Sequence, residues 1–79
     1  MLWGMKRGPN VSRQAYKLGR HIQKVRQAQG ITQEELAEKI HVSQTWITLI
    51  ETGKKTPNLR LLQKIAKAIG VKVKDLIPF

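Results

Sequence analysis

The segment from Ser43 to Glu51 carries side chains of types that can bind nucleobase edges. If the segment is helical, Ile47 and Ile50 form a narrow apolar stripe, and four side chains must face away from it: Gln44, Thr45, Thr48 and Leu49. A glutamine near a helix start can make two hydrogen bonds to an adenine edge, and Thr45 can bond a base or pack on a thymine methyl group. Leu49 also suits a thymine methyl group. The plainer interpretation is that all four are ordinary surface residues.

Five further residues are candidates for binding phosphate beside such a helix: Gln33, Ser43, Lys54, Lys55 and Asn58. Gln33 stands at the expected start of a preceding helix, where free N–H groups and the helix dipole favour an anion. Lys54, Lys55 and Asn58 follow the segment and would flank a bound backbone on its other side. Trp46 lies between the apolar and the outward faces, and we interpret it as a packing residue.

The sequence lacks the residue pairs that catalysis or metal binding would need. It contains no Cys, and the two histidines, His21 and His41, are too few for a zinc site without help from carboxylates. No nucleophile is paired with a base. Glu34, Glu35 and Glu38 are explained by a helix start, where acidic residues are favourable. We therefore expect no enzyme activity, no metal and no cofactor.

The balance of charge indicates a polyanionic partner. The 79 residues hold 15 Lys and Arg against 5 Asp and Glu, which gives a formal net charge of +10. Such an excess destabilises a compact fold by self-repulsion and is typical of proteins that bind nucleic acid. A solvated surface, or adhesion to anionic lipid, is the alternative. Lys17, Arg20 and Lys24 are the least informative cations, because any soluble helix can carry such charges.

The length of the chain allows one domain with one modest core. Residues 1–11 contain Gly, Pro and a Lys-Arg pair without clear periodicity, and we expect them to form a flexible basic arm in front of a domain spanning 12–79. No apolar run approaches the roughly 20 residues of a membrane span, and the first residues do not resemble a signal peptide. A cytoplasmic protein is therefore expected.

Apolar periodicity predicts a first helix from about Ser12. Leu18 and Ile22 recur at helical spacing, with polar residues between them. Gly30 is placed to end this helix in the left-handed conformation, with Ile31 as the hydrophobic contact of a Schellman motif.

The next two helices are predicted to be short and close together in the sequence. Thr32 and Glu35 are spaced as a capping box, and the stripe behind them is Leu36, Ala37 and Ile40. Ser43 is a strong N-cap for the third helix. Two helices separated by about three residues must cross steeply, as in a helix-turn-helix, with the small Ala37 at the crossing. The turn needs a positive φ, which falls to His41.

A basic loop at 52–57 precedes a fourth helix capped by Asn58. Its expected inward residues are Leu59, Leu62, Ile65, Ala66 and Ile69. Gly70 ends it, and Val73 with Leu76 allows a fifth helix of a single turn. The predicted class is all-α, with four to five short helices.

Taken together, these motifs resemble the helix-turn-helix domain shared by phage Cro and cI repressors and many bacterial regulators. The matching residues are Leu18-Gly19, Ile22, Arg26, the run 30–37, Val42-Ser43, Ile47, Ile50-Glu51, Gly53, Pro57, Leu62, Ile65-Ala66, Gly70-Val71 and Leu76. The resemblance implies a compact bundle similar to lambda repressor, in which the second and third helices form the helix-turn-helix. It also implies a bacterial or phage-encoded protein that is associated with the nucleoid. Two positions depart from it. His41 replaces a usual Gly, and Lys72 replaces a frequent Ser or Asp cap, so the fifth helix should be marginal.

The resemblance also implies roles for individual residues. The helix that begins at Ser43 would lie in the major groove of DNA. The glutamine at the position of Gln33 binds backbone phosphate and braces the first side chain of the next helix, here Gln44. Arg26 and Glu51 match positions that form a partly buried, structural ion pair.

Two classes of function stay open. The first is a sequence-specific regulator of transcription, in particular a repressor, that binds double-stranded DNA as a homodimer. The apolar residues 76–79 are then a candidate dimer seam, unless Leu76 only caps the core. The second is an antitoxin or adaptor whose main client is a partner protein such as a toxin, with residues 1–10 as the partner-binding element.

Overall fold

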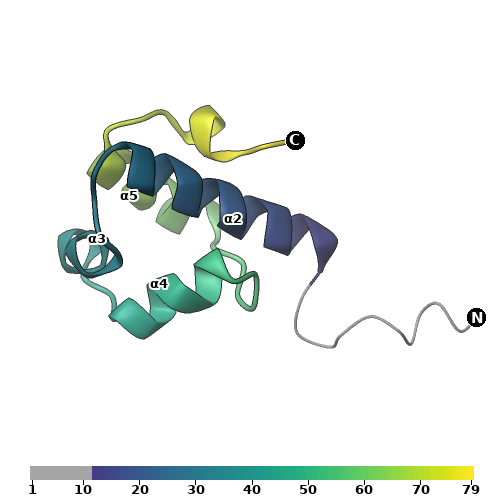
Figure 1. Cartoon of the computed structure of the whole chain (residues 1–79), viewed down its shortest axis with the longest axis horizontal. Helices are drawn as coiled ribbons and strands as arrows, with labels where there is room; N and C mark the ends of the chain where they lie inside the picture. The colour runs from purple at the N-terminus through teal and green to yellow at the C-terminus, as the bar shows by residue number, and fades with distance from the viewer. Residues whose placement is uncertain (1–11) are drawn as a thin grey trace, which may run out of the picture.

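The computed structural model describes residues 12–79, and all of its regular structure is helical. Four α-helices are followed by one short 3₁₀-helix (Figure 1): α2 (Arg13–Ala28), α3 (Gln33–Ile40), α4 (Gln44–Glu51), α5 (Leu59–Ile69) and η1 (Val73–Leu76). No strand occurs within residues 12–79, so the predicted all-α class is confirmed. The arm expected at residues 1–11 lies outside the described residues.

The four α-helices begin where the sequence predicts, each behind a capping side chain. Ser12, Ser43 and Asn58 each accept a hydrogen bond from the backbone N–H three residues further on, at 3.0, 3.1 and 2.8 Å. Thr32 and Glu35 form a complete capping box, with bonds of 3.0 Å to the Thr32 hydroxyl oxygen and 2.9 Å to the Glu35 carboxylate. These side chains satisfy N–H groups that a helix start leaves without partners, so the starts are set locally.

Three helices end at a residue in the left-handed conformation, as predicted. Gly30 has a φ of 73°, and the Ile31 N–H donates to the Arg26 carbonyl at 3.1 Å, which is the long bond of a Schellman motif. Gly70 ends α5 with a φ of 89°. His41 has a φ of 60° and is the only non-glycine with positive φ among residues 12–79. The turn between α3 and α4 is therefore made at a cost of roughly 1–2 kcal/mol in backbone strain.

One hydrophobic core joins all five elements. Helix α2 packs on α4 and η1, whereas α3 packs on α4 and α5, and α5 also packs on η1. The largest fully buried side chains are Ile22, Leu36, Ile47, Ile50, Ile65 and Leu76. Figure 1 shows α4 along one side of the molecule and η1 with the C-terminal residues across α2 from it.

The C-terminal part of the structure differs from the sequence-based prediction at Leu59 and is more specific at Leu76 and in the last helix. Leu59 was expected inside, but its side chain is 63% exposed. It is the first residue of α5 and lies at the edge of the apolar stripe of that helix, where no neighbouring element covers it. Leu76 is fully buried and belongs to the core, so Ile77, Pro78 and Phe79 are the exposed residues of the apolar end. The predicted fifth helix is a single 3₁₀ turn without a side-chain cap from Lys72.

Two glycines allow α2 to approach the end of α4 at backbone distance. A Cβ atom on Gly19 would overlap the Ile50 carbonyl oxygen and lie 2.8 Å from that of Glu51. A Cβ atom on Gly53, whose φ is 82°, would lie 2.8 Å from the Tyr16 Cα atom. The clashing atoms are backbone atoms of packed elements, which cannot turn away as a flexible side chain would. The position of the α4 end is therefore fixed directly by α2.

Gly19→Ala should destabilise the fold, although Ala is favoured over Gly by about 1 kcal/mol in a helix interior. We expect a net loss of about 1–3 kcal/mol, because the added methyl group forces α2 and α4 apart. The measurement is urea unfolding followed by circular dichroism. Gly30→Ala is the control, since nothing lies within 4 Å of its Cβ position and only the positive φ of 73° is penalised. A higher stability for Gly19→Ala would contradict the close approach.

Candidate nucleic-acid interface

Helix α4 is fixed by its apolar side and presents a polar side to solvent. Ile47 and Ile50 are each 1% exposed and anchor the helix in the core. On the opposite side Gln44, Thr45 and Thr48 are exposed, so three of the four predicted base-contact residues share one open face. The fourth, Leu49, is half-buried, and its carbonyl oxygen accepts the N–H groups of residues 54 and 55 at 2.9 and 3.1 Å. The basic loop thus folds back onto the end of α4.

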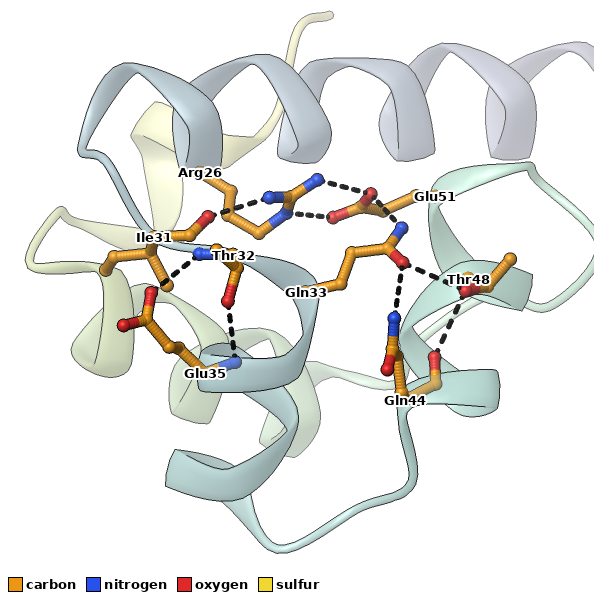
Figure 2. Close-up of polar contacts among 8 residues, drawn as sticks. All are labelled: Arg26, Ile31, Thr32, Gln33, Glu35, Gln44, Thr48 and Glu51. Carbon is orange, nitrogen blue, oxygen red and sulfur yellow. Dashed lines mark hydrogen bonds and ion pairs between the residues drawn. The ribbon is translucent and has the colours of Figure 1, made fainter.

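The buried pair Arg26–Glu51 holds the far end of this helix. The Arg26 Nε atom donates to Glu51 Oε2 at 2.6 Å and the Nη2 atom to Oε1 at 3.0 Å, while Nη1 donates to the Ile31 carbonyl at 2.7 Å (Figure 2). The two side chains are only 6% and 1% exposed. Among the described residues no buried side-chain nitrogen or oxygen lacks a hydrogen-bond partner. The pair therefore joins α2, the α2–α3 connection and α4 through fully satisfied groups.

Gln33 connects this ion pair to the exposed face of α4. Its Nε2 atom donates to Glu51 Oε1 at 2.8 Å. Its Oε1 atom accepts from Gln44 Nε2 at 3.4 Å and from the Thr48 hydroxyl at 3.1 Å (Figure 2). The contact with Gln44 is the one that the family resemblance implies. The contacts with Glu51 and Thr48 were missed, because no spacing rule along the sequence relates residues 33, 48 and 51.

The predicted phosphate-binding residues surround α4 without forming one cluster. Gln33 and Ser43 lie at the starts of α3 and α4, whereas Asn58 starts α5 and uses its Oδ1 atom as the cap. Lys54 and Lys55 are exposed in the loop after α4. The Lys55 ammonium lies 5.6 Å from the centre of the Trp46 ring, which holds that cation beside the half-buried indole.

Other kinds of site find no support in the part of the chain that the structure describes. No group of three or more His, Asp or Glu residues there is arranged to hold a metal ion. None of its helices is long and apolar enough to cross a membrane.

Comparisons with known proteins identify the family of this domain. A family model described as helix-turn-helix (HTH_3) matches residues 22–76, which includes α3, α4 and the turn between them. This chain belongs to the Cro/cI-type helix-turn-helix family. The buried ion pair, the capping box and the exposed face of α4 are thus features of a helix-turn-helix domain.

Several relatives and solved structures resemble this helix-turn-helix domain over most of its length. An uncharacterized HTH-type transcriptional regulator of Archaeoglobus fulgidus is 43% identical over 58 residues, which cover 73% of this chain and 83% of that protein. The solved structure of the clp gene regulator ClgR from C. glutamicum is 29% identical with a TM-score of 0.78, covering 87% of this chain and 88% of that one. The restriction-modification controller protein C.AhdI from Aeromonas hydrophila is 25% identical with a TM-score of 0.76, covering 80% and 96%.

Arg26→Met should cost about 3–5 kcal/mol, because it leaves the Glu51 carboxylate buried without its cation. The measurement is the free energy of unfolding in urea at neutral pH. The control is the double variant Arg26→Met with Glu51→Leu, which removes both charges and should recover much of the loss. If Arg26→Met melts at the temperature of the unmodified protein, the pair does not hold the helices together.

Proposed function

We propose that this chain is a regulator of transcription that binds double-stranded DNA at specific sequences, with α4 in the major groove. The observation that carries the proposal is the open polar face of α4, fixed from behind by two buried isoleucines and the Arg26–Glu51 pair. Relatives named as transcriptional regulators and the net charge of +10 support it. An α-helix with its side chains is about 10–12 Å across, which suits a major groove about 12 Å wide.

Base recognition is assigned to Gln44, Thr45, Thr48 and Leu49. Gln44 lies in the first turn of α4, and its amide can pair with an adenine edge. Thr45 can bond a base or contact a thymine methyl group, and Thr48 lies one turn after Gln44 on the same face. Leu49 can contribute only its exposed part, which suits a methyl group better than a polar edge.

Phosphate contacts are assigned to Gln33, Ser43, Lys54, Lys55 and Asn58. The starts of α3, α4 and α5 offer backbone N–H groups and the positive end of a helix dipole to an anion. The two lysines add positive charge beyond the other end of α4. Contacts of this kind fix the position of the protein on the duplex and carry no sequence information.

We further propose that the protein binds DNA as a homodimer, because one domain of this size contacts only part of a site. One α4 reads about half a helical turn, and two copies related by a two-fold axis would read half-sites about 34–36 Å apart. Ile77 and Phe79 are the candidate seam, because they are 36% and 64% exposed beyond the buried Leu76. Repression is the mode we favour, since a dimer bound across a promoter blocks access without a further contact.

A second candidate function, as an adaptor for an acidic partner protein, rests on the outer face of α2. Lys17, Arg20 and Lys24 line a groove together with Pro78, on the side of α2 away from Gly19. Multiprotein-bridging factor 1 of Candida albicans is 40% identical over 57 residues, which cover 38% of that protein. If this function holds, replacing the three cations by Gln removes binding of the client protein and leaves the base preference on DNA unchanged.

Selection from a randomised duplex library should yield one motif, bound about 10³-fold or more tightly than scrambled DNA. Gln44→Ala should then relax the preference at one base pair and cost about 1–3 kcal/mol, because the base loses its paired amide. Lys55→Ala is the control. It should weaken binding to all sequences alike and reduce the slope of log affinity against log salt concentration by about one. Equal binding of every sequence by the unmodified protein would refute sequence-specific recognition.

Phe79→Ser should shift the protein toward monomer in sedimentation velocity, because it removes the most exposed aromatic ring of the proposed seam. Leu59→Ser is the matched control, since Leu59 is exposed to a similar extent, 63%, at the start of α5. Dissociation of the dimer by Leu59→Ser alone would place the seam on α5 instead.

A further inference from the structure

We infer that Glu51 determines base specificity as a positioning residue, by fixing which end of the Gln33 amide faces Gln44. The inference rests on the proposed function, in which Gln44 contacts a base. Hydrogen bonds link Glu51 to Gln33 and Gln33 to Gln44, and the direction of the first bond limits the direction of the second (Figure 2).

The first restriction comes from the carboxylate. An ionised carboxylate can only accept hydrogen bonds, and Glu51 is 2% exposed, so its oxygens need protein donors rather than water. Arg26, which has only donors, supplies two of them. The third must come from the Gln33 side chain, at 2.8 Å from Oε1, and the only donor that Gln33 has is its NH₂ group. The orientation of this amide is therefore dictated by the chemistry of Glu51.

The second restriction follows from the planarity of the amide. With the NH₂ group of Gln33 turned toward Glu51, its Oε1 atom faces α4. There it accepts from Gln44 Nε2 at 3.4 Å and from the Thr48 hydroxyl at 3.1 Å. The Gln44 donor therefore agrees with the orientation that the carboxylate imposes. The Thr48 hydroxyl is compatible with either orientation, because it can donate or accept and also lies 3.2 Å from the Gln44 carbonyl oxygen.

The third restriction falls on the groups that Gln44 presents to DNA. One of its two N–H bonds is directed at Gln33, which leaves Oε1 beside the other N–H. An acceptor next to a donor complements the N6 and N7 atoms of adenine. Guanine offers two acceptors, O6 and N7, so the Gln44 oxygen would face an acceptor there. The orientation set by Glu51 thus favours adenine over guanine at this base pair.

The same orientation serves a phosphate. A phosphate oxygen also accepts only, and Gln33 has a second N–H that is not used by Glu51. Binding of the DNA backbone therefore requires no rotation of the Gln33 amide, so the site is ordered before DNA arrives. Preorganisation of this kind reduces the entropy lost on binding.

Glu51→Gln should remove the single direction of the hydrogen bonds. Arg26 donates to both oxygens of Glu51 and Gln33 to one of them, so an amide at this place sets its NH₂ group against an Arg26 donor in either orientation. When that NH₂ group faces Gln33, the Gln33 amide turns over and Gln44 directs both N–H bonds outward, where they suit the two acceptors of guanine. The two directions then compete, and the preference for adenine over guanine should fall by about fivefold or more.

The test uses the full chain and the duplex selected by the unmodified protein, together with a second duplex that carries guanine in place of adenine at the base pair relaxed by Gln44→Ala. The measured quantity is the Kd for the guanine duplex divided by the Kd for the adenine duplex. It is measured at a temperature at which circular dichroism shows each variant to be folded. Ile65→Val, in the core of α5, is the control for lost stability and should keep the original ratio. Gln33→Met is the second variant, because it leaves the ion pair intact and frees the Gln44 amide, and its ratio should fall about fivefold or more.

The outcomes separate this inference from the proposed function. If no motif is selected, or if Gln44→Ala relaxes no base pair, the proposed function fails. If such a base pair exists and both Glu51→Gln and Gln33→Met keep the original ratio, the role of Glu51 is overturned. If Glu51→Gln does not fold at any temperature, the ratio for Gln33→Met decides alone.

Discussion

A buried guanidinium and a buried carboxylate set the conditions for the rest of this small domain. Withdrawing each charge from water costs several kcal/mol, and the cost is offset only where every polar atom finds a partner. Arg26 and Glu51 meet this condition because the Ile31 carbonyl and the Gln33 amide complete their hydrogen bonds. The pair is thus satisfied in one arrangement of α2, α3 and α4, and Gly19 permits the backbone approach that this arrangement requires. We regard the pair mainly as a device that specifies geometry.

This geometry matters most for α4, which is too short to be stable alone. Isolated helices below about 12–15 residues are marginal in water, and α4 has eight. It is held at its start by the Ser43 cap, along its length by Ile47 and Ile50, and at its end by Glu51. Because all of these restraints act from one side, the opposite face is left open and ordered. A rigid helix with one free polar face is what readout of a DNA groove demands.

The local signals in the sequence predicted the elements well, because caps and left-handed stops depend on a few neighbouring residues. The predicted starts at Ser12, Thr32, Ser43 and Asn58 and the positive φ at His41 are all present. Contacts between elements were predicted less completely. Whether Leu59 is buried depends on how far neighbouring elements extend past the start of α5. The hydrogen bond from Gln33 to Glu51 depends on the relative positions of α2, α3 and α4. Apolar periodicity gives the direction of a side chain but not what covers it.

The most direct test of α4 as the DNA-reading element is a map of the bound surface in solution. Backbone amide shifts in ¹H–¹⁵N spectra, followed while the selected duplex is added, would provide it. If α4 contacts the DNA, the largest changes fall on residues 33, 43–49 and 54–58, with small changes along the outer face of α2. The largest changes around Lys17, Lys24 and Phe79, with α4 unaffected, would contradict it.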